Sequence, residues 1–450
     1  MIVNTKVHMI RKDWSRFSLA YVLMFGAFFS DAFLWQNIIW GLDFRGIYVI
    51  LVLVCVVSIT ARRFVLLPRE IVTINGVLLL WSIFPIIKHP FVAPVVLGQL
   101  AGAMGMGWLA YYFLSDVDGF RPLAERYLKI VQFLAAFVLI DQILYLLAGI
   151  EFVRMIFGVI PARSFDGYVV HGLYRASGLL YEPSQVGLLV APAVFFWLYM
   201  RRFWSALLGC LAILASFSFL GFMGFFFAFV LSRRSLFKSI VVAVCLFVLT
   251  LLLSSVPIFE ARVGAFIDLG QEVLSGETIS AESLSAKRGT TATLVANSVI
   301  ASFGAGGAPS FGWGLGSFRV FYSEFLEDLL PGASQLSGFY NPGGGSLLIR
   351  MIFELGFLGT LLVFLVFWFR IRTVSKLGLF CDRWRLAWVL ASVCFFLLCI
   401  LRKDMFVSFY FWFFLMAFVQ ATRRALKFRI RGVASVPFCS ENYSPTHNNR

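Results

Sequence analysis

The most promising chemistry in the sequence lies in the segment RASGLLYEPS, residues 175–184. Arg175 is suited to bind phosphate because its guanidinium presents a rigid fork of donors. Pro183 is typical of a first helical turn and opens an apolar stretch, so free backbone N–H groups and the positive end of a helix dipole should gather nearby. The segment predicts an anion site, unless Arg175 only caps the loop or pairs with Asp166 or Glu182. Two further candidate ligands precede it, Arg163 and His171.

A second group of candidates lies more than a hundred residues further along the chain. Arg288 precedes a plausible helix, and the glycine-rich segment 312–319, GWGLGSFR, ends at Arg319. Either arginine could bind phosphate through charge-assisted hydrogen bonds, or could pair with acids such as Glu282 or Glu324. The segment lacks the G-x-G-x-x-G spacing and the preceding strand of a nucleotide-binding loop.

A third candidate is the segment GFYNPGGGS, residues 338–346, which opens another apolar stretch. Its glycines would let the backbone approach a ligand closely, or would form a flexible hinge into the helix. Ionisable residues inside apolar stretches are also candidates. Arg350 and Glu354 are four residues apart, so we expect them to pair on one helix face. We expect Asp141 to form a hydrogen bond within the helix bundle rather than to orient a loop arginine.

The composition defines the scaffold that must position these residues. Of 450 residues, 60% are hydrophobic and 14% charged, whereas soluble proteins carry roughly 25% charged residues. The sequence therefore predicts an all-α, polytopic bundle of transmembrane helices. The seven cysteines form no C-x-x-C pair and the four histidines are scattered, so we expect neither a metal site nor a redox motif. The net charge of +15 follows the membrane topology and does not indicate nucleic-acid binding.

The hydropathy pattern predicts about twelve membrane spans. Phe203–Leu231 could be one long helix or two short ones broken at residues 216–218, and we favour two. With that choice, about two thirds of the 38 lysines and arginines fall on the cytoplasmic side, as the positive-inside rule requires. The predicted spans are 17–36, 46–60, 71–87, 91–115, 128–149, 177–200, 203–217, 218–232, 236–256, 345–369, 384–401 and 405–422.

The same topology leaves two long segments on the outer side. These are residues 150–176 and the large loop 257–344, between spans nine and ten. Loops of this length are uncommon unless they are functional, so we expect the chemistry on this face. A basic leader, 1–16, runs into the first span without a cleavage site, and a basic tail, 423–450, follows the last. Both termini are therefore expected in the cytoplasm.

The order of these segments along the chain resembles that in the bacterial O-antigen polymerase (Wzy-type) and O-antigen ligase superfamily. The resemblance covers roughly residues 170–365 and the span count. The matching pieces are Arg175–Gly178 with Glu182-Pro183-Ser184 opening a span, a long outer loop with Arg288 before a helix, the motif at 312–318, and Glu354-Leu-Gly-Phe-Leu-Gly359. Ligases typically carry a histidine where the loop returns to the membrane, and this chain has Tyr340-Asn341 there, which favours a polymerase.

The resemblance implies a metal-independent glycosyltransferase without cofactors in the bacterial inner membrane. It would join undecaprenyl-diphosphate-linked repeat units at the periplasmic face, with a chain-length regulator protein as a further partner. Arg175 and Arg288 would hold the diphosphate, assisted by Arg319 and Arg163, and Glu182 is the candidate base for the acceptor hydroxyl. The candidate glycan ligands are Tyr181, Tyr340, Asn341 and His171.

Two other functions stay open. A ligase would transfer finished glycan to lipid A-core or protein. A transporter would move a polysaccharide or solute, although transporters commonly show internal repeats and this sequence has none.

Overall fold

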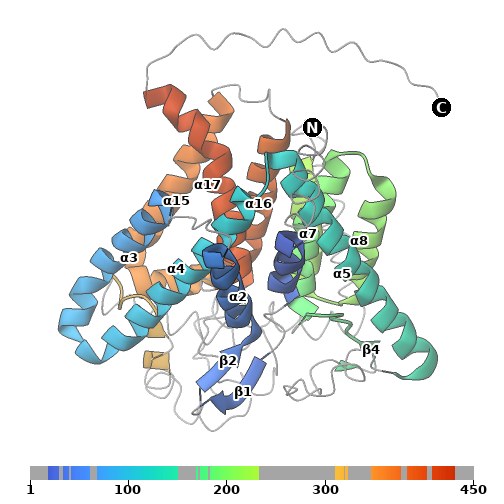
Figure 1. The fold of residues 1–450 in the computed structure, drawn as a ribbon, viewed down its shortest axis with the longest axis horizontal. Coiled ribbons are helices and arrows are strands. Elements are labelled where there is room, and N and C mark those ends of the chain that lie inside the picture. Colours follow the sequence, from blue (N-terminus) through green and yellow to red (C-terminus); the bar gives the residue numbers. More distant parts are fainter. Residues whose placement is uncertain are drawn as a thin grey trace, which may run out of the picture.

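The structure is a computed structural model that is mainly helical (Figure 1). It describes residues 19–29, 34–39, 42–60, 68–150, 169–170, 173–180, 183–232, 310–318, 320–322, 346–376, 383–402 and 408–430. The helices are Leu19–Phe29, α2 (Gly46–Thr60), α3 (Arg69–Lys88), η2 (Pro90–Val92), α4 (Ala93–Ser115), α5 (Phe120–Ala148), α7 (Pro183–Tyr199), α8 (Phe203–Ala215), α9 (Phe219–Ser232), α15 (Leu347–Lys376), α16 (Arg383–Arg402) and α17 (Phe409–Ile430).

Most predicted spans coincide with observed helices. The helices α2, α3, α8, α9 and α16 each begin and end within two residues of the predicted limits. The break between α8 and α9 is confirmed, since Phe217 has a positive φ of 41° and no helix continues through it. Predicted span 236–256 lies outside the described residues.

Other boundaries differ from the prediction. Helix α5 begins at Phe120 rather than 128, α7 begins at Pro183 rather than 177, and α17 runs from Phe409 to Ile430 rather than over 405–422. Helix α15 extends seven residues beyond the predicted end, to Lys376. The additional turns of α5, α15 and α17 contain charged residues, which lower the local hydropathy and so excluded these turns from the predicted spans.

The predicted first span is wrong at its C-terminal end. The described part of the helix covers Leu19–Phe29, and residues 34–36, expected to belong to the same span, lie in strand β1 (Leu34–Ile39), which pairs antiparallel with β2 (Leu42–Arg45). Aromatic and aliphatic residues on both sides of a two-residue connection that contains Gly41 favour a hairpin over a helix. A second short hairpin pairs β3 (Val169–Val170) with β4 (Leu173–Tyr174). The described fold is therefore helical apart from these two short hairpins, which the prediction of an all-α fold did not include.

The described helices alternate between two ends of the bundle. Both hairpins lie at one end, at the bottom of Figure 1, which we call the loop end; the opposite end is the basic end. At the basic end, contacts join Trp388 Nε1 to the Phe120 carbonyl (3.0 Å), Arg383 Nη2 to the Tyr199 carbonyl (2.8 Å), and Arg423 to Glu70 (3.3 Å). At the loop end, contacts join Tyr410 to the Phe28 carbonyl and Ser346 to the Ile400 carbonyl.

Five described helices are long and apolar enough to cross a membrane. They are α3, η2 with α4, α5, α15 as far as Thr373, and α16. Shorter apolar helices of 10–17 residues accompany them. Large apolar side chains also face outward, including Ile87 (72% exposed) and Leu147 (81% exposed). Such surfaces suit hydrocarbon rather than water, so the architecture is that of a membrane-embedded protein.

Candidate functional site

The segment that carries Arg175 contacts helices α5 and α8 at the loop end. Tyr174 Oη donates a hydrogen bond of 2.9 Å to Oδ2 of Asp141 on α5, and both side chains are buried. The Tyr174 ring stacks on Tyr145, one helical turn from Asp141, with ring centroids 4.3 Å apart. Asp141 thus forms a hydrogen bond inside the bundle, as expected, but its partner is the residue next to Arg175.

The backbone after Arg175 is fixed as well. The Ala176 N–H donates to the Ala215 carbonyl at the end of α8 (3.2 Å). Gly178 has a φ of +56°, and a Cβ there would lie 2.9 Å from Cγ2 of Val138 on α5. The segment is therefore held by α5 on one side and by α8 on the other.

Arg175 itself is partly buried, with its Nε atom inside the protein. Helix α7 begins at Pro183, eight residues further along the chain, so Pro183 stands in the first helical turn, as its residue type predicted. The N-terminus of α7, the positive end of its helix dipole, therefore follows Arg175 closely in the sequence. The backbone next to Arg175 is fixed, and this arrangement is suitable for holding an anion.

The other predicted site residues cannot be placed beside Arg175. They all lie outside the described residues: Arg163, His171, Tyr181, Glu182, Arg288, Arg319, Tyr340 and Asn341. The convergence of Arg175 and Arg288 therefore stays a prediction. Within the ranges that the structure describes, no group of three or more His, Cys, Asp or Glu side chains could hold a metal ion.

The glycine-rich segment joins α15 at the loop end. Helix α15 is broken at Gly356, where φ is 68° and ψ is −179°. A break leaves carbonyls of the preceding turn in need of other donors. The N–H of Trp313 donates to the Phe353 carbonyl (3.0 Å) and the N–H of Gly314 to the Glu354 carbonyl (2.9 Å). We call Ser310–Phe318 together with Phe353–Gly356 the glycine joint.

The glycines of this joint are required by its geometry. Gly312, Gly314 and Gly316 have φ values of 69°, 90° and 80°. A Cβ on Gly312 would lie 2.5 Å from the carbonyl oxygen of Glu354, and a Cβ on Gly356 would lie 2.6 Å from the Gly312 nitrogen. The two backbones therefore touch in a way that only glycine permits. The sequence predicted a glycine-rich turn here, but not its docking partner.

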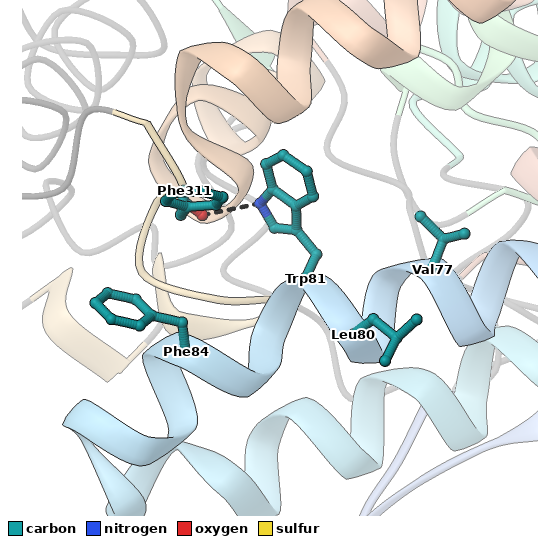
Figure 2. Close-up of a pocket in the computed structure, with 5 residues that line it drawn as sticks. All are labelled: Val77, Leu80, Trp81, Phe84 and Phe311. Carbon is teal, nitrogen blue, oxygen red and sulfur yellow. Dashed lines mark hydrogen bonds between the residues drawn. The ribbon is translucent and has the colours of Figure 1, made fainter.

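Trp81 of α3 completes the joint. Its indole Nε1–H is shared between the carbonyls of Phe311 (2.9 Å) and Leu355 (3.0 Å), and Figure 2 shows the first of these bonds. The neighbouring Ser82 Oγ accepts a hydrogen bond from the Leu315 N–H (3.3 Å). Three segments far apart in sequence are thereby locked together. No sequence signal distinguished Trp81, because it sits within an uninterrupted apolar pattern.

Arg350 and Glu354 form the predicted pair. Arg350 Nε lies 2.8 Å from Glu354 Oε1, and Arg350 Nη2 donates to Gln99 Oε1 of α4 (3.3 Å). Both side chains of the pair are largely buried, and Gly316 packs against Gln99. These groups therefore connect α15 with α4 beneath the glycine joint.

No known family model and no curated protein matches this sequence. The resemblance to the O-antigen polymerases and ligases therefore depends on the order of the motifs in this chain.

Proposed function

We propose that the protein is a polysaccharide polymerase of the bacterial inner membrane. It would transfer growing glycan from undecaprenyl diphosphate onto the next lipid-linked repeat unit, building O-antigen, capsule or exopolysaccharide. The proposal combines the order of the sequence motifs with a membrane-embedded helical architecture.

The glycine joint is the observation that best supports this proposal. Two motif pieces named by the resemblance, Gly312–Phe318 and Glu354–Gly359, meet directly through the backbone hydrogen bond from Gly314 to Glu354. The C-terminal part of the segment 257–344 is thereby tied to the bundle at the loop end, where Arg175 also lies. The described residues Ser310–Phe318 and the segment that carries Arg175 thus lie at the same end of the bundle, as a diphosphate site shared with Arg288 would require.

The charge distribution supports a periplasmic position for that face. Cytoplasmic ends of membrane helices carry an excess of lysine and arginine. The described helix ends and adjoining turns at the loop end carry Arg45, Lys88, Arg175, Arg350 and Arg402. Those at the basic end carry Arg69, Arg121, Arg126, Arg201, Arg202, Arg370, Arg372, Arg383, Arg385 and Arg423.

The proposed chemistry is a glycosyl transfer driven by charge stabilisation. The acceptor hydroxyl attacks the anomeric carbon of the donor while the bond from that carbon to the diphosphate oxygen breaks. Arg175 and Arg288, with Arg319 and Arg163 nearby in the two segments, would stabilise the charge that develops on the departing diphosphate. Glu182 would accept the hydroxyl proton. Tyr181, His171, Tyr340 and Asn341 would contact the sugars.

Two variants test this assignment. In a deletion strain complemented with Arg175→Ala or Arg288→Ala, we expect glycan chain growth to fall by at least about 100-fold, as for loss of a donor to a developing oxyanion. The matched control is Arg121→Ala, since Arg121 is 69% exposed at the basic end. Long glycans persisting in both variants, at normal protein levels, would contradict the proposal.

A further inference from the structure

Helix α3 has a groove on its surface that faces away from the rest of the bundle. This groove is separate from the proposed glycan site. It has a volume of about 270 Å³ and is lined by Val77, Leu80, Trp81, Phe84 and Phe311 (Figure 2). All five lining side chains are hydrophobic. The Phe311 ring lies 5.4 Å from Trp81 and 6.2 Å from Phe84, measured between ring centroids, and forms one wall.

This groove is open to the surroundings of the bundle. Val77, Leu80 and Phe84 are 54%, 67% and 62% exposed. They lie on a helix long and apolar enough to cross a membrane. An exposed groove of this kind faces hydrocarbon chains rather than water.

The depth of the groove matches one leaflet. At a rise of about 1.5 Å per residue, Val77 to Phe84 spans roughly 10 Å, and Lys88 lies roughly 6 Å beyond Phe84. Half of a typical hydrocarbon core is about 15 Å thick. The groove therefore covers the level of the acyl chains, and Lys88 reaches the level of the headgroups.

Lys88 supplies charge at the polar end of the groove. Its side chain is exposed, and Nζ lies 5.5 Å from the centroid of the Trp313 ring in the glycine joint. Among the described residues, no carboxylate forms an ion pair with Lys88. A lysine and a tryptophan at this depth are typical of a membrane interface, where the ammonium group meets lipid phosphate.

We propose that this groove binds an anionic phospholipid, with one acyl chain against Val77, Leu80 and Phe84 and its phosphate at Lys88. Because Trp81 and Phe311 both line the groove and belong to the contact between α3 and the glycine joint, a bound chain stabilises that contact. The proposal does not depend on the glycosyltransferase assignment.

The test uses the full chain, purified in detergent and stripped of lipid. Phosphatidylglycerol and phosphatidylethanolamine with identical acyl chains are titrated separately, and binding is followed by native mass spectrometry and by the thermal unfolding midpoint. We expect phosphatidylglycerol to bind about fivefold more tightly, the effect of one lysine near a membrane phosphate, and to raise the midpoint. Lys88→Gln should abolish this preference, whereas Lys129→Gln, an exposed lysine on α5, should keep it.

A second experiment fills the groove with a larger side chain. Val77→Trp should lose the high-affinity lipid, whereas Val72→Trp, on the same helix and 51% exposed but outside the groove, should retain it. Any of three results would overturn the proposal. These are equal loss of lipid in both tryptophan variants, equal binding of the two lipids by the unaltered protein, and a preference for phosphatidylglycerol that survives Lys88→Gln. The proposal would also be overturned if a prenyl phosphate, rather than a phospholipid, copurified with the unaltered protein and was lost in Val77→Trp.

Discussion

At Gly356 the backbone adopts a conformation that side-chain-bearing residues avoid. Its φ of 68° and ψ of −179° fall in a region that is essentially restricted to glycine. A Cβ would also lie 2.6 Å from both the Gly312 nitrogen and the Ser310 oxygen. We expect Gly356→Ala to cost about 2–6 kcal/mol of stability, the sum of backbone strain and steric overlap.

Thermal unfolding in detergent measures this cost, and a second glycine provides the control. Gly98 lies within α4, and a Cβ there would have no atom within 4 Å. Gly98→Ala should be neutral or stabilising by about 0.5–1 kcal/mol, because alanine favours a helix. Equal midpoints for the two variants would refute the described geometry of the glycine joint.

The indole N–H of Trp81 contributes separately to the joint. Trp81→Phe keeps an aromatic ring but removes the shared donor to the carbonyls of Phe311 and Leu355. We expect a loss of about 1–2 kcal/mol, measured from the thermal midpoint, because the two carbonyls lose their shared donor. Trp204→Phe, at a side chain that is 85% exposed, should change stability by less than about 0.5 kcal/mol. A similar loss in both variants would mean that ring size, not the hydrogen bond, matters.

The pair of helices α7 and α9 depends on small residues at their crossing. A Cβ on Gly187 would lie 2.4 Å from the Gly221 Cα, so the two backbones are in contact. Close approach through glycine is typical of helix packing in membranes. Gly187→Ala should force α7 and α9 apart, lowering both the yield of folded protein and the thermal midpoint relative to Gly98→Ala. Unchanged yield and midpoint would show that the helices do not cross this closely.

Helices were the part of the fold that the sequence predicted best. Long apolar stretches separated by charged or polar residues gave the limits of α3 and α16, and the break at 216–218 followed from the charge balance. The hairpin at 34–45 was missed because its apolar residues also satisfy a hydropathy window. Helix α5 begins earlier than predicted because its first turns are amphipathic, with Arg126 buried against Asp116.

The candidate site was predictable only where contacts are local. The Arg350–Glu354 pair follows from a spacing of four residues on a helix. The hydrogen bond between Tyr174 and Asp141 joins residues 33 apart, and that between Trp81 and Leu355 joins residues 274 apart. Nothing in hydropathy or spacing specifies such pairs, because they arise from how helices pack in three dimensions.

The orientation of the whole molecule gives a further prediction. In a cysteine-free background, Ile150→Cys at the loop end and Arg202→Cys at the basic end place one thiol on each side. A membrane-impermeant maleimide should label Ile150→Cys in intact spheroplasts, but Arg202→Cys only after permeabilisation. The reverse pattern would place the loop end in the cytoplasm and contradict a periplasmic reaction.

The lipid-linked glycan profile of a deletion strain tests the proposed polymerase activity most directly. We predict that single repeat units on undecaprenyl diphosphate accumulate and that long polymer disappears, and that the unaltered gene restores polymer while the Arg175→Ala gene does not. Accumulation of long, lipid-linked polymer would instead indicate a ligase. A profile identical to that of the parent strain would contradict any role in glycan transfer.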